Sequence, residues 1–183
     1  PKSENPQAYF NSVSGAHPID SMGLTLIHEH MLVDFIGADL VSTDRYDPDS
    51  VIAKVLPYLL EVRRFGVKTI LDCTPYFLGK DPELLRFLSE KSGIQLVTNT
   101  GFYGAVDGKY LPEYVFSESA EQLAARWIAE FENGIGDSKI QPGLIKISVN
   151  AETPLREVDA KLVRDAGLTL QETGLQIASH TGA

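Results

Sequence analysis

The sequence predicts an α/β fold built around parallel β-strands. Short runs rich in β-branched residues alternate with helical stretches of about 12 to 20 residues. Three of those stretches are preceded by a capping side chain and a proline. Because a helix separates each strand from the next, the strands should run parallel with right-handed crossovers. The expected strands are residues 24–30, 67–75, 94–103, 143–150 and 175–181.

The helices between these strands are predicted mainly from their ends. Asp47, Asp81 and Thr153 each precede a proline, which suits the first turn of a helix. Ser119, with Gln122 three residues later, has the pattern of a capping box. The glycines expected to end helices are Gly66, Gly93, Gly134 and Gly174.

Two features are expected inside the helices. Pro57 should kink or split the first helix, because proline lacks the N–H that a helix interior uses. The third helix should bury one apolar face, formed by Leu123, Trp127, Ile128 and Phe131.

Two architectures fit this order of elements. One is an open, doubly wound sheet of five parallel strands, and the other is a partial (β/α)8 TIM barrel containing strands one to five of eight. A complete barrel typically needs about 250 residues, whereas the chain has 183. We expect a single domain over residues 1–183, with 1–23 as an N-terminal extension and 24–183 as barrel strands one to five. The spacing of apolar residues alone does not choose between the two architectures.

Composition argues against several classes of function. The 25 acidic and 16 basic residues give a net charge of −9, which disfavours nucleic-acid and anionic-membrane partners. No apolar run approaches the roughly 20 residues of a membrane span. The single cysteine, Cys73, cannot form an internal disulfide and is expected to be a small core residue. A cytoplasmic location is therefore expected.

The end of the first strand carries two histidines in the stretch "TLIHEHMLVDF". His28 and His30 are two positions apart, so their side chains should point to the same face of the strand. Leu24 and Leu26 are expected to share that face, and Glu29 to point to the opposite one. Active sites of α/β folds form at the carboxyl ends of strands. The pair therefore indicates either a metal site or two ordinary polar residues at a strand end.

The fourth strand carries a lysine at a position expected to be buried. Ile145 and Ile147 should pack against helices, so Lys146 should face the opposite side of the sheet together with Leu144 and Ser148. Burial of a charged lysine is costly and lowers its pKa, which leaves an amine that can react or bind. The alternative is a lysine whose amine reaches solvent beyond the strand end.

A third histidine, His180, ends the fifth strand on the face that it shares with Gln176 and Ala178. Taken alone, it is best interpreted as a satisfied polar residue. Three strands, however, bring a common set of nitrogen-bearing side chains to the same rim: His28, His30, Lys146 and His180. This combination favours a metal site much more strongly than any one of its members.

The stretches "GLTLIHEHMLVDF", "TGFY", "GLIKIS" and "ASHTGA", in this order and spacing, resemble the phosphotriesterase-related branch of the amidohydrolase superfamily, which includes phosphotriesterase-like lactonases. The resemblance extends from about Gly15 to Ala183. It implies a (β/α)8 barrel with two divalent metal ions, expected to be zinc. His28 and His30 would bind the more buried ion, His180 the more exposed one, and Lys146, carboxylated by carbon dioxide, would bridge both as a carbamate.

The resemblance also implies a reaction. A hydroxide between the two ions would attack an ester while one ion polarises the substrate oxygen, with Lys146 and Tyr103 as the catalytic residues. Tyr103 resembles the tyrosine of lactonase-like members, although it could simply pack on the rim. The expected substrate is a small lactone or another carboxylic ester, shaped by the loop at residues 104–119. A weak phosphotriesterase side activity and a homodimer are left open.

The chain departs from the family pattern in one respect. The family also uses a histidine from strand six and an aspartate from strand eight, and neither is present, so we expect a truncated barrel that is inactive alone. His17 precedes the barrel and should not substitute. Asp72 could orient a ligand histidine or cap the next helix. The rival function is a non-catalytic metal-binding or regulatory α/β module, and metal binding without turnover would favour it.

Overall fold

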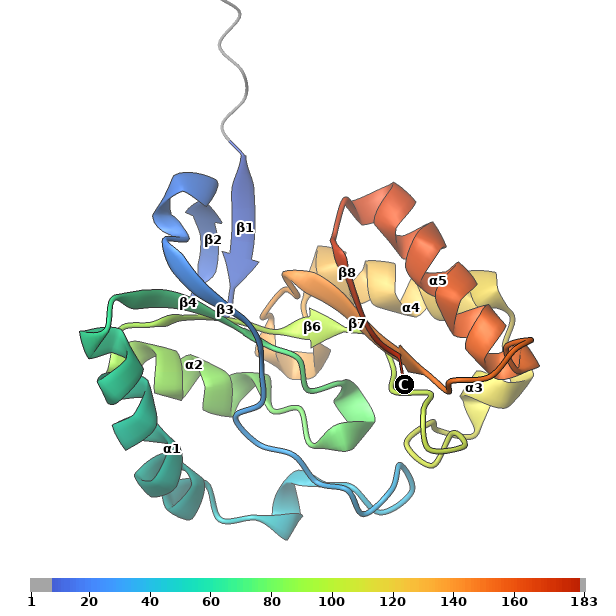
Figure 1. Ribbon diagram of the computed structural model, residues 1–183, viewed down its shortest axis with the longest axis horizontal. Helices are drawn as coiled ribbons and strands as arrows, with labels where there is room; N and C mark the ends of the chain where they lie inside the picture. Colours follow the sequence, from blue (N-terminus) through green and yellow to red (C-terminus); the bar gives the residue numbers. More distant parts are fainter. Residues whose placement is uncertain (1–7, 182–183) are drawn as a thin grey trace, which may run out of the picture.

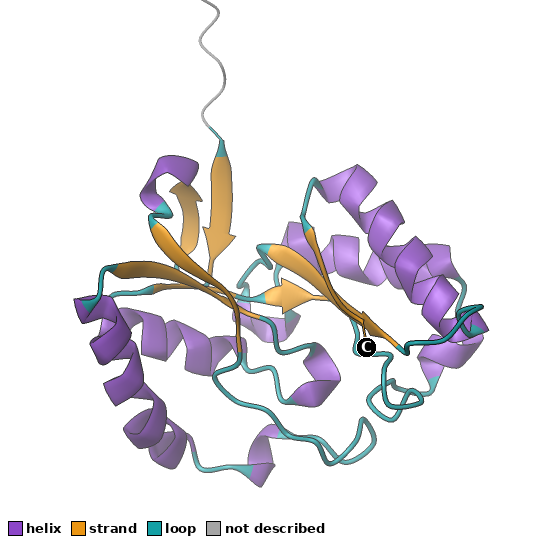
Figure 2. Ribbon diagram, in the orientation of Figure 1, coloured by secondary structure: helices purple, strands orange, loops and turns teal. Residues whose placement is uncertain are grey.

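The computed structural model describes residues 8–181, and its core is two three-stranded parallel sheets (Figures 1 and 2). The first sheet has the order β3 (Leu24–Glu29), β4 (Val67–Asp72) and β5 (Gln95–Val97). The second has the order β6 (Asn99–Thr100), β7 (Leu144–Val149) and β8 (Ile177–Thr181). Among the described residues, β3 pairs only with β4 and β8 only with β7, so one edge of each is free.

The expected third strand, residues 94–103, is broken at Thr98, so the prediction of one uninterrupted strand is wrong. Its first half, β5, pairs with β4, and its second half, β6, pairs with β7. The free edge of β5 is occupied by the N-terminal segment, because Val13 N–H donates to Leu96 O at 2.8 Å. Thr98 O accepts instead from Gly143 N–H at 2.9 Å, just before β7. The chain therefore changes strand partner at Thr98.

An N-terminal hairpin, which the sequence did not predict, precedes the barrel strands. Its strands are β1 (Tyr9–Ser12) and β2 (Gly15–Pro18), which pair antiparallel. In Figure 1 the hairpin stands beside the start of β3. Residues 1–7 of the expected extension, and residues 182–183 at the other end, lie outside the described residues.

Five α-helices are described: α1 (Pro48–Arg64), α2 (Pro82–Ser92), α3 (Tyr114–Ser117), α4 (Ala120–Asn133) and α5 (Glu157–Thr173). Four short 3-10 turns are Ile19–Ser21, Thr43–Arg45, Tyr76–Leu78 and Gly136–Ser138. The expected caps are confirmed at Asp47, which accepts from Ser50 N–H, and at Asp81, which accepts from Leu84 N–H. Ser119 with Gln122 forms the predicted capping box.

One expectation about helices is wrong, and of a second, that Pro57 kinks or splits the first helix, the split is excluded. Helix α1 continues through Pro57 without splitting, and Pro57 lies on its exposed side, where water can satisfy the carbonyl that proline leaves free. The last helix does not start at Thr153–Pro154, a cis peptide bond, but at Glu157, with Arg156 as its N-cap. The Arg156 side chain bonds to Asp159 in the first turn and so marks where the helix begins.

The helices cover one side of the sheets only. One apolar cluster joins Ile70 and Leu96 to α1 and α2, and a second joins Ile145 and Ile147 to Trp127 and other residues of α4 and α5. Side chains alternate along a strand, so the neighbouring positions face the opposite side. There they form a third cluster without helix residues, made of Cys73, Val97 and Leu144 with Phe10, Leu71 and Ala178 packed against it. A doubly wound sheet would carry helices on both faces; the fold is a partial (β/α)8 barrel.

Candidate functional site

His28 and His30 lie at the carboxyl end of β3, with ring centroids 5.3 Å apart in an edge-to-face arrangement. Leu26 pairs with Ile70, yet Glu29 pairs with Asp72, so β3 has one extra residue opposite β4. This bulge reverses the alternation of side chains. Leu26 therefore packs in the cluster under α1, and the prediction that it shares a face with the two histidines is wrong.

Lys146 is on the inner face of β7, as its neighbours predicted. It is 1% exposed, and its Nζ has no hydrogen-bond partner among the described residues. Burial lowers the pKa of this amine. The inner-face hydroxyl of Ser148, two positions along β7, is also buried and has no partner in the described part of the chain. The barrel interior thus contains a buried amine whose pKa lies below that of an exposed lysine and whose nitrogen has no partner among the described residues.

His180 lies on β8, next to β7, and pairs in register with Ser148. The Tyr103 ring is 5.6 Å from the His180 ring, and Tyr103 forms an isolated bridge with Ser148. Tyr103 is therefore placed against His180 by its backbone pairing.

The three histidines and Lys146 are near enough to affect one another electrostatically. Burial lowers the pKa of His30 to about 4, and the charges of His28, Lys146 and His180 contribute. Burial, then Lys146 and His180, also lowers the pKa of His28. Both imidazoles are neutral at neutral pH, which is the form that binds metals. Within residues 8–181, no three side chains of the types His, Cys, Asp and Glu come together as a complete metal site.

The structure adds residues that the sequence left unassigned or missed. Thr74 Oγ1 lies 3.0 Å from His30 Nδ1. Asp72 accepts from Thr74 N–H at 3.0 Å and from Met31 N–H at 2.8 Å. It therefore bonds to the backbone next to His30 and not to a histidine side chain, and Asp81 caps the next helix. Burial raises the pKa of Asp72 to about 6. In the sequence, only its position near a strand end indicated a role for Asp72, and no local pattern indicated a role for Thr74.

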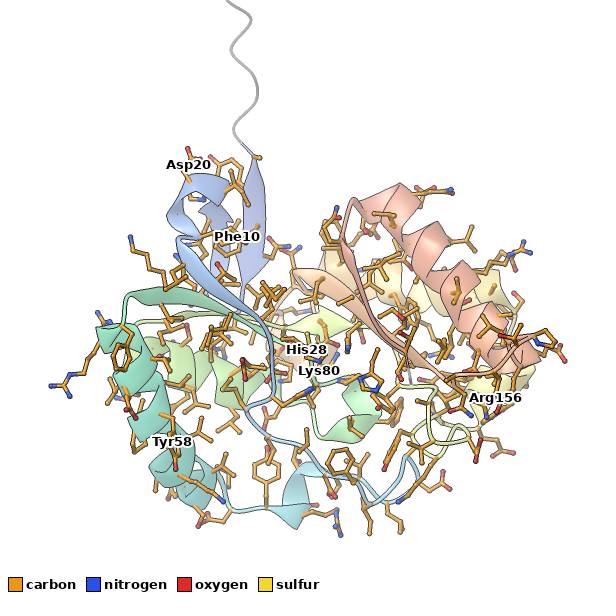
Figure 3. All side chains as sticks on the ribbon, in the orientation of Figure 1. Phe10, Asp20, His28, Tyr58, Lys80 and Arg156 are labelled. Atoms are coloured by element: carbon orange, nitrogen blue, oxygen red, sulfur yellow. The ribbon has the colours of Figure 1, made fainter. Side chains whose placement is uncertain are left out.

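Two further polar residues, Asn99 and Lys80, fix the backbone at Asp72 and Thr74. Asn99 Nδ2 donates to Asp72 O and to Thr74 O, both at 2.9 Å. Lys80 Nζ, buried, donates to Asn99 O at 2.9 Å and lies 3.8 Å from Glu130 Oε2. In the view of Figure 3, His28 and Lys80 both project onto the middle of the molecule. These contacts make the strand ends under the histidines a connected hydrogen-bonded unit.

The rim is bordered by aromatic rings from three segments. Tyr103 lies 5.7 Å from Tyr110, and Tyr110 lies 6.0 Å from Phe35, measured between ring centroids. Phe35 is 58% exposed. Cys73, by contrast, is fully buried, as expected of a core residue, and burial raises the pKa of its thiol to about 11.

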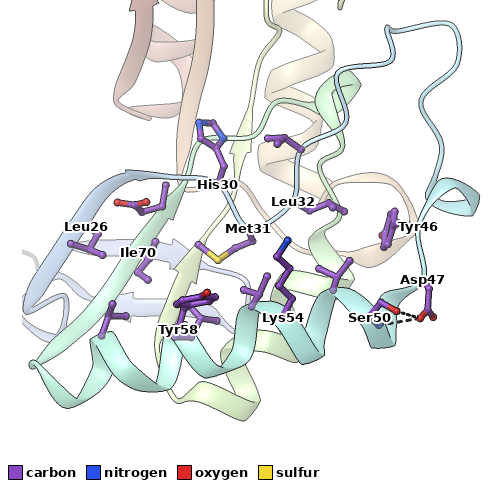
Figure 4. A pocket seen from close by; sticks show the side chains of 16 residues that line it. Leu26, His30, Met31, Leu32, Tyr46, Asp47, Ser50, Lys54, Tyr58 and Ile70 are labelled. Carbon is purple, nitrogen blue, oxygen red and sulfur yellow. Dashed lines mark hydrogen bonds between the residues drawn. The ribbon is translucent and has the colours of Figure 1, made fainter.

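A cavity of about 590 Å³ lies between β3 and α1, with His30 at one end (Figure 4). Its lining is mostly apolar and includes Leu26, Met31, Tyr58 and Ile70. It flanks the free edge of β3, outside the barrel interior.

The strands are parallel, the helices cover one side of them, and titratable side chains gather where the strands end. These features define part of a (β/α)8-barrel protein with its site at the carboxyl rim. The model of the phosphotriesterase family matches residues 8–183. The chain belongs to the phosphotriesterase family.

Individual relatives agree. The chain is 30% identical over 162 residues to the aryldialkylphosphatase of Saccharolobus solfataricus, covering 88% of this chain and 50% of the relative. It is 27% identical over 162 residues to the phosphotriesterase homology protein of Escherichia coli, covering 88% and 53%. It is 24% identical over 188 residues to the phospho-furanose lactonase of Mycoplasmopsis agalactiae, covering 94% and 52%. The chain therefore spans about half the length of the curated relatives it matches.

None of the helices described within residues 8–181 is long and apolar enough to cross a membrane.

Proposed function

We propose that this chain supplies part of the active site of a metal-dependent hydrolase, with His28, His30, Lys146 and His180 as metal ligands. The observation that carries the proposal is the buried Lys146 amine, which has no hydrogen-bond partner within residues 8–181. A buried polar group left unpaired costs free energy. Conversion to a carbamate between two cations would give this position an anion with two partners, and a neutral amine is the form that reacts with carbon dioxide.

The donor set fits two divalent ions, which we expect to be zinc. His28 and His30 would hold one ion, His180 the other, and the Lys146 carbamate would contact both. When bound, such a pair of ions polarises the oxygen of an ester and supplies an activated water. Neutral imidazoles, which the lowered pKa values of His28 and His30 ensure, are the required ligand form.

The protein's own residues would hold the substrate at the rim. Tyr103, next to His180, borders the place where an ester would meet the ions, and Tyr110 and Phe35 continue an apolar wall away from it. This wall favours a small lactone or another carboxylic ester, with phosphotriester hydrolysis as a weak side activity. The names of two relatives, a lactonase and an aryldialkylphosphatase, support this pair of activities. A cytoplasmic location and a homodimer remain predictions.

The test uses the natural protein that carries this sequence, loaded with zinc. We expect hydrolysis of lactones, weaker hydrolysis of a phosphotriester, and no activity after Lys146→Ala. Short carboxylic acids should partly restore the alanine variant, because they can take the place of the carbamate. Lys91→Ala, at an exposed position near the end of α2, is the control. Full activity of Lys146→Ala would refute the bridging role, and zinc binding without any turnover would favour the non-catalytic module.

A further inference from the structure

Arg156, the N-cap of α5, holds a backbone carbonyl of another loop. Its Nε donates to Asp159 Oδ2 at 2.7 Å and its Nη2 to Asp159 Oδ1 at 3.1 Å, so the guanidinium grips the carboxylate with two nitrogens. The same Nη2 donates to Gly104 O at 2.9 Å. Asp159 is fully buried. Because the buried Asp159 carboxylate restrains the Arg156 guanidinium, the guanidinium can in turn fix the position of the Gly104 carbonyl.

Gly104 directly follows Tyr103, the aromatic residue against His180. Its N–H donates to Ser148 O at 2.9 Å, so β7 holds one backbone group and Arg156 holds the other. A Cβ at this position would lie 2.6 Å from Ser148 O and 2.9 Å from Asp159 Oδ1. Only glycine fits in this close packing. The same packing fixes the backbone at Gly104, where the chain leaves the sheet after Tyr103.

The loop that continues from Gly104 contains a strained turn. Val106 and Asp107 have φ values of 58° and 55°, in the left-handed region, which a β-branched valine rarely adopts and an aspartate tolerates better. Such strain persists only where the surroundings hold it. Asp107 Oδ1 accepts from Asn150 Nδ2 at 2.8 Å, and Arg156 Nη1 lies 3.5 Å away. Arg156 thus contacts the loop both at its start and at its strained turn.

We propose that Arg156 is a positioning residue for the substrate loop, residues 104–119. Through Gly104 it fixes Tyr103 beside His180, and through Asp107 it keeps the turn in one conformation. Its guanidinium bonds to Asp159, Asp107 and Gly104, so it acts on the site through the loop. The effect on turnover rests on the proposed function, whereas the effect on loop order does not.

The experiment compares Arg156→Gln and Arg156→Lys with Arg164→Gln in the natural protein. Arg164 lies on the same helix and pairs with Glu121 on the surface at 2.7 Å, so its variant is the matched control. The readouts are hydrogen exchange of the amides of residues 104–119, bound zinc, and kcat and KM for a series of lactones.

For Arg156→Gln we expect exchange in the loop to accelerate by about tenfold or more, with bound zinc unchanged. The value of kcat/KM should fall by about 10²-fold, because a shift of about 1 Å in a positioning group can cost that much. Arg156→Lys should restore part of the protection, since an ammonium cannot grip Asp159 and Gly104 in one planar fork. Arg164→Gln should match the parent protein.

Unchanged exchange in the loop of both Arg156 variants would overturn the proposal. Loss of zinc or of protection throughout the barrel in Arg156→Lys would also overturn it, because Arg156 would then be a general structural residue. If the parent protein hydrolyses no lactone, the proposed function fails; faster exchange confined to the loop would still support the positioning role.

Discussion

Thr74 Oγ1 and His30 Nδ1 lie 3.0 Å apart, joining the ends of two adjacent strands. Because this bond occupies Nδ1, it directs Nε2 toward any metal that His30 binds. Thr74 is itself held through its backbone, where its N–H donates to Asp72 and its carbonyl accepts from Asn99. The histidine is therefore oriented by a side chain whose own position is fixed.

Removal of the Thr74 hydroxyl should weaken metal binding. Thr74→Val keeps the shape of the side chain but leaves His30 without this partner, so zinc affinity should fall by about 10- to 100-fold. Thr74→Ser, which keeps the hydroxyl, should retain most of the affinity. Competition with a chromogenic chelator measures both variants. Equal affinity of the valine variant and the parent protein would remove Thr74 from the site.

Two glycines should respond oppositely to alanine. A Cβ at Gly101, where φ is +116°, would lie 2.1 Å from Lys146 O, so Gly101→Ala should cost more than about 1 kcal/mol of stability. Gly167, inside α5, has nothing within 4 Å of an added Cβ. Gly167→Ala should therefore stabilise the protein by about 0.5–1 kcal/mol. Urea unfolding at neutral pH measures both changes, and destabilisation by Gly167→Ala would contradict the packing described for α5.

Asp165 should make stability depend on pH. This residue of α5 is buried, neither carboxylate oxygen has a hydrogen-bond partner within residues 8–181, and burial raises its pKa to about 7. The folded state therefore binds the proton more tightly than the unfolded state, whose pKa is about 3.9. The stability from this group is complete below about pH 4 and is lost as the pH rises through about 7.

The variant Asp165→Asn tests this dependence. Its urea midpoint should exceed that of the parent protein at pH 8, and the two midpoints should converge as the pH falls toward 4. Asp44→Asn, at an exposed position, should keep the parent's pH profile. A profile for Asp165→Asn that is identical to the parent's would show that Asp165 is not held in a protonated form.

The ends of helices and the buried faces of strands could be predicted because they depend on residues that are close together in the sequence. Capping by Asp47 and Asp81 and the apolar pair Ile145 and Ile147 depend only on neighbours in sequence. The break at Thr98, in contrast, involves partners far away in the chain, because Val13 bonds to Leu96 on β5 and Gly143 bonds to Thr98.

The candidate site also contains some features that the sequence predicts and others that it does not. Its histidines and lysine could be found from strand alternation and family resemblance, but the bulge before Glu29 depends on pairing with β4. Thr74 is 44 residues from His30 in sequence and meets it only because β3 and β4 are adjacent. Contacts between strands are set by tertiary pairing, which no local pattern encodes.

In the proposed metal centre, Lys146 as a carbamate would join His28, His30 and His180 in holding two metal ions. The most direct test is a crystal structure of the natural protein grown with zinc and bicarbonate, with anomalous scattering measured at the zinc edge. We expect two anomalous peaks about 2.0–2.1 Å from the histidine nitrogens, with branched density extending from Lys146 Nζ to both. An unbranched Lys146, or zinc bound away from these four residues, would contradict it.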